Sequence, residues 1–178
     1  MILLVRHILV RLAGATIAVV FGLSLICPTA ATAGLATPAG PVILVVKGKI
    51  GETNVGDEAH FDREMLMALG MRSLTTHNPF ETGLQEYEGV LFSDVLKAVD
   101  ADGEVLVGTA LDGYSIEIPV EDIMTFPVML AMTWNGEVMR PRNKGPLWVV
   151  YPIDQYPELQ DETYSVRTIW QLADIDVR

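Results

Sequence analysis

Cysteine is nearly absent from this 178-residue sequence, and the single one, Cys27, lies in an apolar segment near the N-terminus. Residues 34–178 therefore contain no thiol that could form a disulfide, attack a substrate or bind a metal through sulfur. Basic residues are scarce too, because 12 Lys and Arg stand against 23 Asp and Glu, a formal net charge of −11. Nucleic-acid binding needs a basic face that neutralises phosphates, so we expect no nucleic-acid partner.

The familiar catalytic motifs are also missing. The sequence has no nucleophile elbow, phosphate-binding loop or dinucleotide fingerprint. The acidic stretch GDEAHFDRE, residues 56–64, combines one His with four carboxylates, but its spacing matches no defined metal-binding signature. Metal binding by this stretch is chemically possible, and a solvated, acidic start of a helix is the simpler interpretation.

The first 33 residues have the pattern of a secretory signal peptide. Arg6 and Arg11 give a positive start, residues 12–27 are apolar and uncharged, and Ala31-Thr32-Ala33 offers a small-x-small cleavage pattern. An uncleaved membrane anchor is the alternative, but the apolar run is shorter than the roughly 20 residues that a spanning helix needs. We therefore predict cleavage near Ala33 and a periplasmic or secreted protein without a membrane span.

Cleavage would leave a linker of small residues over 34–40 and one domain over 41–178. The domain is long enough to bury a hydrophobic core. Its net charge would be −13, because the removed segment carries two of the 12 basic residues and none of the 23 acidic ones.

Short apolar runs predict an α+β domain that is mainly β, with mixed sheets and a few short helices. Asp112-Gly113 and Asn135-Gly136 are favoured hairpin turns. Two short helices are expected, one from Asp62 as N-cap to Leu69 and one over residues 94–99 with Ser93 as N-cap, and one helical turn after Pro119. Strands are expected at residues 41–47, 71–76, 104–111, 114–119, 128–134, 137–140 and 147–151, and in the C-terminal segment 165–178.

The few cations gather in the segment RPRNKG, residues 140–145. Arg140, Arg142 and Lys144 could bind an anionic ligand, or they could pair with surface carboxylates, which is common. Alternation with Pro141 would place the two arginines on the same side of an extended segment. Residues 143–145 predict a tight turn in which Gly145 supplies backbone freedom.

Four segments occur in an order that resembles the sulfite-oxidase-type molybdopterin-binding domain. They are YEGVLFSDVLKAV (87–99), DGYSIEIP (112–119), GPLWVVYP (145–152) and VRTIWQLADIDV (166–177). The resemblance runs from about residue 42 to the C-terminus. It implies a sulfite-oxidase-like fold, with a pterin-bound molybdenum among loops at the sheet ends. In the catalytic members it implies oxidation or reduction of small oxo-substrates such as sulfite or sulfoxides.

The sequence departs from the catalytic pattern at the residues that would hold this cofactor. The resemblance places a molybdenum-binding cysteine just before the YEGV element, where Thr75, Thr76 and His77 stand. A threonine hydroxyl is not deprotonated as a coordinating thiol is. A His-Gly-x-Pro-x-Arg run that would hold the pterin phosphate corresponds to NKGPLW, which puts Asn143 at the His and Trp148 at the Arg.

Three hypotheses follow. The first is a non-catalytic, cofactor-free module that binds a small anionic ligand or an envelope protein, with the anion where the 140–144 loop meets the DGYS turn. The second is a molybdopterin-dependent oxidoreductase that holds molybdenum through Thr76 or His77. The third is a structural subunit that docks through an apolar patch of Met132, Trp134 or Trp170. The candidate ligand-binding residues are Arg140, Arg142, Asn143, Lys144, Trp148, Tyr114, Thr76, His77 and Arg167.

Overall fold

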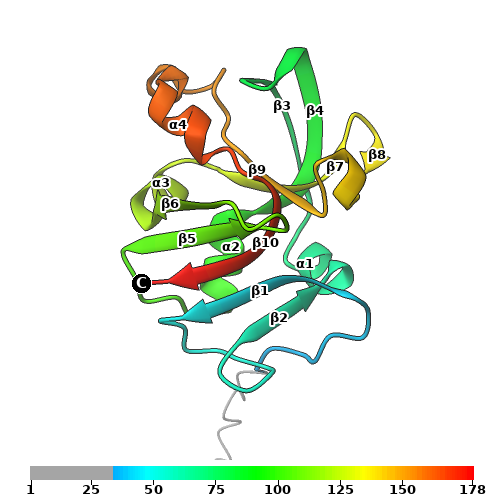
Figure 1. Cartoon of the computed structure of the whole chain (residues 1–178), viewed down its shortest axis with the longest axis vertical. Coiled ribbons are helices and arrows are strands. Elements are labelled where there is room, and N and C mark those ends of the chain that lie inside the picture. The colour runs from blue at the N-terminus through cyan, green and yellow to red at the C-terminus, as the bar shows by residue number, and fades with distance from the viewer. Residues whose placement is uncertain (1–33) are drawn as a thin grey trace, which may run out of the picture. The chain divides into compact units, whose positions relative to one another are not determined.

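The computed structural model describes residues 34–178, so the predicted signal peptide lies outside the described residues (Figure 1). Residues 34–40 form no helix or strand. The amides of Ala39 and Gly40 each donate a hydrogen bond of 2.8 Å to the Asp62 carboxylate, which holds this segment against the domain. None of the helices in this part of the chain combines the length and apolar character that crossing a membrane requires.

One branched sheet of ten strands organises residues 34–178, with short helices around it (Figure 1). The strands are β1 (Val42–Gly48), β2 (Ala59–Asp62), β3 (Arg72–Asn78), β4 (Glu81–Leu91), β5 (Val105–Ala110), β6 (Ser115–Pro119), β7 (Met129–Trp134), β8 (Glu137–Val138), β9 (Leu147–Val150) and β10 (Trp170–Val177). The helices are α1 (Arg63–Ala68), α2 (Phe92–Ala98), α3 (Val120–Thr125) and α4 (Glu162–Arg167), with 3-10 turns at Pro141–Asn143 and Pro157–Gln160. The predicted α+β, mainly β fold is confirmed.

The sheet branches at β10. The second half of β10 runs parallel to β1 and antiparallel to β5, whereas Trp170 and Leu172 at its start pair with β9. The register shifts between these two residues, where Gln171 has a left-handed φ of 54°. From β9 the sheet continues through β7 and β4 to β3, so the β3–β4 hairpin rises away from β1 and β2 (Figure 1).

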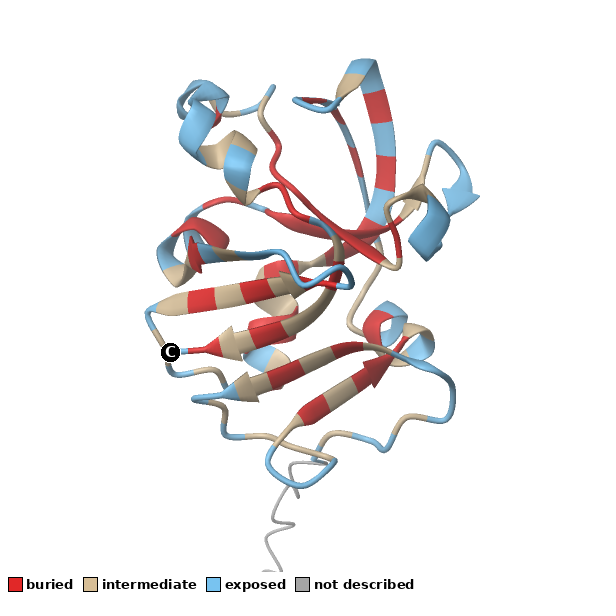
Figure 2. Ribbon diagram, in the orientation of Figure 1, coloured by how far each residue is buried: buried red, intermediate tan, exposed pale blue. Residues whose placement is uncertain are grey.

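Two hydrophobic clusters lie on opposite faces of the central strands β7 and β9. Successive side chains of a strand point to opposite faces. Leu130 and Val149 therefore join the larger cluster, whereas Ala131 and Trp148 join the smaller one. Both strands are buried on both sides (Figure 2), which explains why their sequences are continuous apolar runs.

Several local predictions are confirmed. Asp112-Gly113 joins β5 to β6, and Asn135-Gly136 joins β7 to β8. Asp62 is the N-cap of α1, where its Oδ1 accepts a hydrogen bond of 2.9 Å from the Met65 amide.

Two local predictions are wrong, and one long strand was missed. Helix α2 begins at Phe92, so Ser93 lies inside it, and the N-cap is Leu91 without a side-chain hydrogen bond. The C-terminal segment is not one strand, because α4 precedes β10. Strand β4 was not expected, since its first half contains Gly83 and polar residues in place of the β-branched pattern.

The turn at residues 143–145 also differs from expectation. Lys144, not Gly145, adopts the left-handed conformation, with φ of 66°. Gly145 is needed for space: an added Cβ would lie 2.5 Å from the backbone nitrogen of Arg140 and the carbonyl carbon of Met139. The glycine thus allows the loop to fold back on the residues that precede it.

Gly89 is the point of closest approach between β4 and β7. It pairs with Ala131, and an added Cβ would lie 2.7 Å from Ala131 Cα and still closer to the carbonyl oxygen of Leu130. We expect Gly89→Ala to lower the free energy of unfolding by about 1–3 kcal/mol, because one strand must shift. Urea unfolding measures this. Gly40→Ala is the matched control, since its Cβ would meet nothing nearer than 3.5 Å; equal losses in the two variants would contradict the prediction.

Candidate functional site

Three tryptophans from three strands surround the ammonium group of Lys144. The distance from Nζ to the ring centroid is 4.5 Å for Trp148, 5.3 Å for Trp134 and 5.5 Å for Trp170. The Trp148 ring meets the other two nearly edge-on, at interplanar angles of 85° and 87°. Glu81, the first residue of β4, forms a close ion pair with Nζ. We call these five residues the lysine cage.

Within the cage, the Glu81 carboxylate neutralises the Lys144 ammonium and the indole rings surround it. The side chains of Lys144 and Glu81 are 25% and 24% exposed, so both are largely withdrawn from water. Partial burial lowers the pKa of Lys144 from its ordinary value of 10.5, and the adjacent carboxylate favours the charged form. Each cation–π contact adds about 0.5–2 kcal/mol. This cation, a candidate for binding an anionic ligand, already has its counterion.

The other two cations of the segment lie apart from Lys144. Arg140 and Arg142 are exposed and form no ion pair with any residue in the range 34–178. Residues 141–143 form a 3-10 turn, which removes the extended backbone on which their predicted common side depended. The Oδ1 atom of Asn143 accepts a hydrogen bond of 2.5 Å from the Arg140 amide and closes this turn.

Gln171 connects the 140–144 loop to the turn between β5 and β6. Its amide donates to the Lys144 carbonyl and its own carbonyl accepts from the Leu111 amide, both at 2.9 Å. Its side chain donates to the Pro141 carbonyl at 2.5 Å. The two loops therefore lie side by side, and this contact is made by backbone groups rather than by their charged side chains.

Thr76 and His77 point to opposite sides of β3. Thr76 is fully buried, whereas His77 is exposed. Asp154 binds both residues: it accepts from the His77 amide at 2.7 Å and lies 3.0 Å from the His77 ring, while its own amide donates to the Thr76 hydroxyl at 3.4 Å. The hydrogen bond from the His77 amide holds the pKa of Asp154 below its ordinary value. The three residues fasten the loop after β9 to β3.

Arg167 belongs to a different group, between α3 and α4. Its Nη1 donates to Asp122 at 2.6 Å, and the same carboxylate oxygen accepts from the Tyr151 hydroxyl at 3.2 Å. Burial raises the pKa of Tyr151, so its hydroxyl remains a donor. Arg167 also lies 5.5 Å from the ring centroid of Tyr164. This candidate ligand residue is thus bound within the protein.

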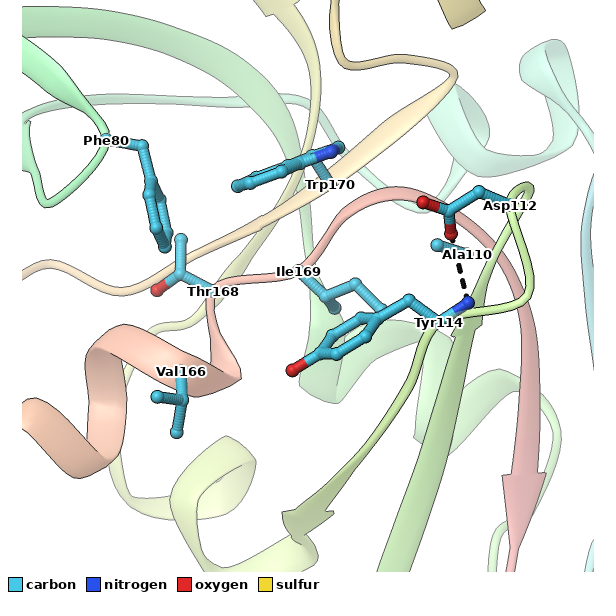
Figure 3. Close-up of a pocket in the computed structure, with 8 residues that line it drawn as sticks. All are labelled: Phe80, Ala110, Asp112, Tyr114, Val166, Thr168, Ile169 and Trp170. Carbon is cyan, nitrogen blue, oxygen red and sulfur yellow. Dashed lines mark hydrogen bonds between the residues drawn. The ribbon is translucent and has the colours of Figure 1, made fainter.

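An apolar cleft (Figure 3) shares Trp170 with the lysine cage. Its volume is about 390 Å³, and three aromatic side chains line it, namely Phe80, Tyr114 and Trp170. Aliphatic and small side chains complete the wall: Ala110, Val166, Thr168 and Ile169. Asp112 is the only charged residue within 34–178 that lines it. We call this space the apolar cleft. Of the candidate ligand-binding residues, Tyr114 lines it, and Trp170 of the predicted docking patch lines it as well.

The sequence analysis missed Phe80 and Glu81, and it named Asp112 only as a turn residue. It proposed Trp148 as a ligand-binding residue and Trp134 and Trp170 as parts of a docking patch, but it did not predict that the three rings meet. Glu81 and Lys144 are 63 residues apart, and no local spacing connects Phe80 or the three tryptophans to one another. The signal exists only in the strand pairing, since Trp148 is the register partner of both Ala131 on β7 and Trp170 on β10.

Comparisons with known proteins agree with this fold. The model of the oxidoreductase molybdopterin binding domain family matches residues 61–155, more than half of the chain. No curated protein matches the chain. Among solved structures, the chain is similar to the sulfane dehydrogenase SoxCD from Paracoccus pantotrophus, with a TM-score of 0.56 and 18% sequence identity. The likeness covers 75% of this chain and 37% of that one, so the chain spans just over a third of its length, and it shows the fold alone.

Proposed function

The chain belongs to the oxidoreductase molybdopterin-binding domain family, and we propose that it acts there as a non-catalytic module that binds a small ligand or a protein partner. The observation that supports this most is the environment of Trp148. It stands where the resemblance places an arginine that holds the pterin phosphate, and it is fully buried in the lysine cage. We infer from this that the protein's own side chains occupy the place that the resemblance assigns to the anionic cofactor.

The residues at the metal position do not fit a molybdenum centre. Residues 34–178 contain no cysteine, so no thiolate is available there. The Thr76 hydroxyl is buried, and the His77 ring is engaged with Asp154. Among the described residues, no three His, Cys, Asp or Glu side chains lie close enough together to hold a metal ion.

The two residues that the resemblance places at the phosphate, Asn143 and Trp148, carry no charge that would hold an anion. Lys144 beside them is paired with Glu81, and among residues 34–178 the only charge lining the neighbouring cleft is the carboxylate of Asp112. Two buried polar atoms in the smaller cluster have no hydrogen-bond partner, the Trp148 indole nitrogen and the Tyr87 hydroxyl. Burial raises the pKa of Tyr87, so that hydroxyl stays neutral. Neutral donors do not supply the charge that phosphate binding uses.

Metal and pterin analysis of the protein from its native cells tests this proposal. We expect only background molybdenum by elemental mass spectrometry, and no pterin fluorescence after denaturing extraction, because neither ligand set is present. A molybdoenzyme purified from the same cells is the loading control. Stoichiometric molybdenum with pterin would overturn the proposal in favour of a molybdopterin-dependent oxidoreductase.

We also propose that the protein is exported and that its signal peptide is cleaved near Ala33. The intact mass of the same preparation tests this, since the mass of an uncleaved chain would contradict it.

A further inference from the structure

We propose that the apolar cleft is a binding site for an organic cation with an apolar body, such as a quaternary ammonium compound or a substituted amine. This inference rests on the proposed ligand-binding function and names the class of ligand. It follows from three properties of the described residues: where apolar side chains are exposed, which charge lines the cleft, and how the adjacent cage holds a cation.

Exposed apolar side chains converge on the cleft from three distant parts of the chain. The exposed fractions are 44% for Phe80, 52% for Tyr114, 49% for Val166 and 36% for Trp170. They come from the β3–β4 turn, the β5–β6 turn, α4 and β10. A cleft of about 390 Å³ is large enough for a small organic molecule. Burying these surfaces would favour a ligand with an apolar body.

The negative charge of the cleft favours a positively charged ligand. One Asp112 oxygen accepts the Tyr114 amide at 3.0 Å (Figure 3), and the other makes no hydrogen bond within residues 34–178. No Lys or Arg of the described part of the chain lines the cleft, and residues 34–178 carry ten basic against 23 acidic residues. An anion would therefore meet repulsion at short and long range, whereas a cation would be attracted at both.

The lysine cage beside the cleft uses the same chemistry on an internal cation. There an ammonium lies among indole rings and is neutralised by Glu81. Trp170 belongs to both places: its ring lies 5.5 Å from Lys144 Nζ and 4.9 Å from the Phe80 ring, edge-on. The cleft repeats the combination of aromatic rings and one carboxylate, but its lining includes no cation. Aromatic faces with a carboxylate are a general means of recognising substituted ammonium groups.

A titration with benzyltrimethylammonium tests the proposal on the folded protein from Gly34 to Arg178. This probe keeps its charge at every pH. We expect saturable binding with a Kd of about 1 mM or tighter for a ligand of this size, a shift of the Trp170 indole NMR signal, and weaker binding as salt is added. Benzenesulfonate and benzyl alcohol, of similar size, should bind at least tenfold more weakly. Equal binding of the anion, or no binding of the cation, overturns the proposal while leaving the molybdenum and pterin result untouched.

Two variants with matched controls locate the site. Asp112→Asn keeps an oxygen for the Tyr114 amide and removes the charge, so we expect affinity for the cation to fall about tenfold or more. Phe80→Ala should weaken binding about two- to fivefold by removing one ring. The controls are Asp57→Asn, an exposed loop carboxylate, and Leu84→Ala, a 61% exposed side chain on the same hairpin that does not line the cleft. Unchanged affinity in Asp112→Asn, or equal losses in the controls, contradicts the assignment.

Discussion

In the Trp148→Arg variant we expect no cooperative unfolding transition and little soluble protein. The substitution restores the residue type that the resemblance places at this position, yet the site cannot accommodate it. Trp148 is fully buried, and its ring makes edge-on contacts with Tyr87, Trp134 and Trp170. Removing a buried tryptophan costs about 3–5 kcal/mol, and an unpaired buried guanidinium adds several more. That sum matches the whole stability of about 5–15 kcal/mol typical of a domain.

Circular dichroism during urea unfolding measures this effect. Trp148→Phe is the matched control, because it keeps an aromatic ring at the same place and should lower the free energy of unfolding by only about 1–3 kcal/mol. Lys144 increases the expected difference in stability between the two variants, because its Nζ lies 4.5 Å from the Trp148 ring and would repel the introduced arginine. A Trp148→Arg protein that unfolds at the wild-type urea concentration would show that this side chain is not part of the core.

The elements of this fold were predictable wherever local chemistry decides them. The turn dipeptides Asp112-Gly113 and Asn135-Gly136 set two hairpins, and the Asp62 side chain set the start of α1. The failure to predict β4 has a non-local cause. Strand β4 is held by pairing with β3 on one side and β7 on the other, so its polar sequence does not need strand propensity. Tertiary pairing overrides propensity in such strands.

The candidate site was less predictable, because strand pairing in the sheet brings its residues together from distant parts of the chain. The cluster of cations at residues 140–144 suggested an anion site, but a charge count along the chain does not show that Glu81 reaches Lys144. Likewise the three tryptophans meet only because β7, β9 and β10 are neighbours in the sheet. The substitution of Trp148 for arginine was visible in the sequence. The full burial of Trp148 beside the Lys144 ammonium became visible only in the structure.

Arg167→Ala is expected to lower the free energy of unfolding by about 3 kcal/mol, although Arg167 is a candidate ligand-binding residue. Its loss would leave the Asp122 carboxylate, whose side chain is 11% exposed, with the Tyr151 hydroxyl alone. Breaking a buried pair by removing one partner costs about 3–5 kcal/mol, and the lower value applies because Arg167 itself is 20% exposed. Arg178→Ala is the control: its pair with Asp176 involves a 59% exposed arginine, so its loss should cost at most about 1 kcal/mol.

The double variant Asp122→Asn/Arg167→Ala separates a lost contact from a stranded charge. If most of the loss in Arg167→Ala comes from the uncompensated carboxylate, then removing that charge as well should recover about 1–2 kcal/mol relative to the single variant. The Tyr151 hydroxyl, 3.2 Å from Asp122 Oδ2, can donate equally well to an asparagine oxygen. A residue kept for binding would behave in the opposite way, with nearly unchanged stability in Arg167→Ala and no recovery in the double variant. That outcome would indicate that Arg167 serves ligand binding and does not stabilise the contact between α3 and α4.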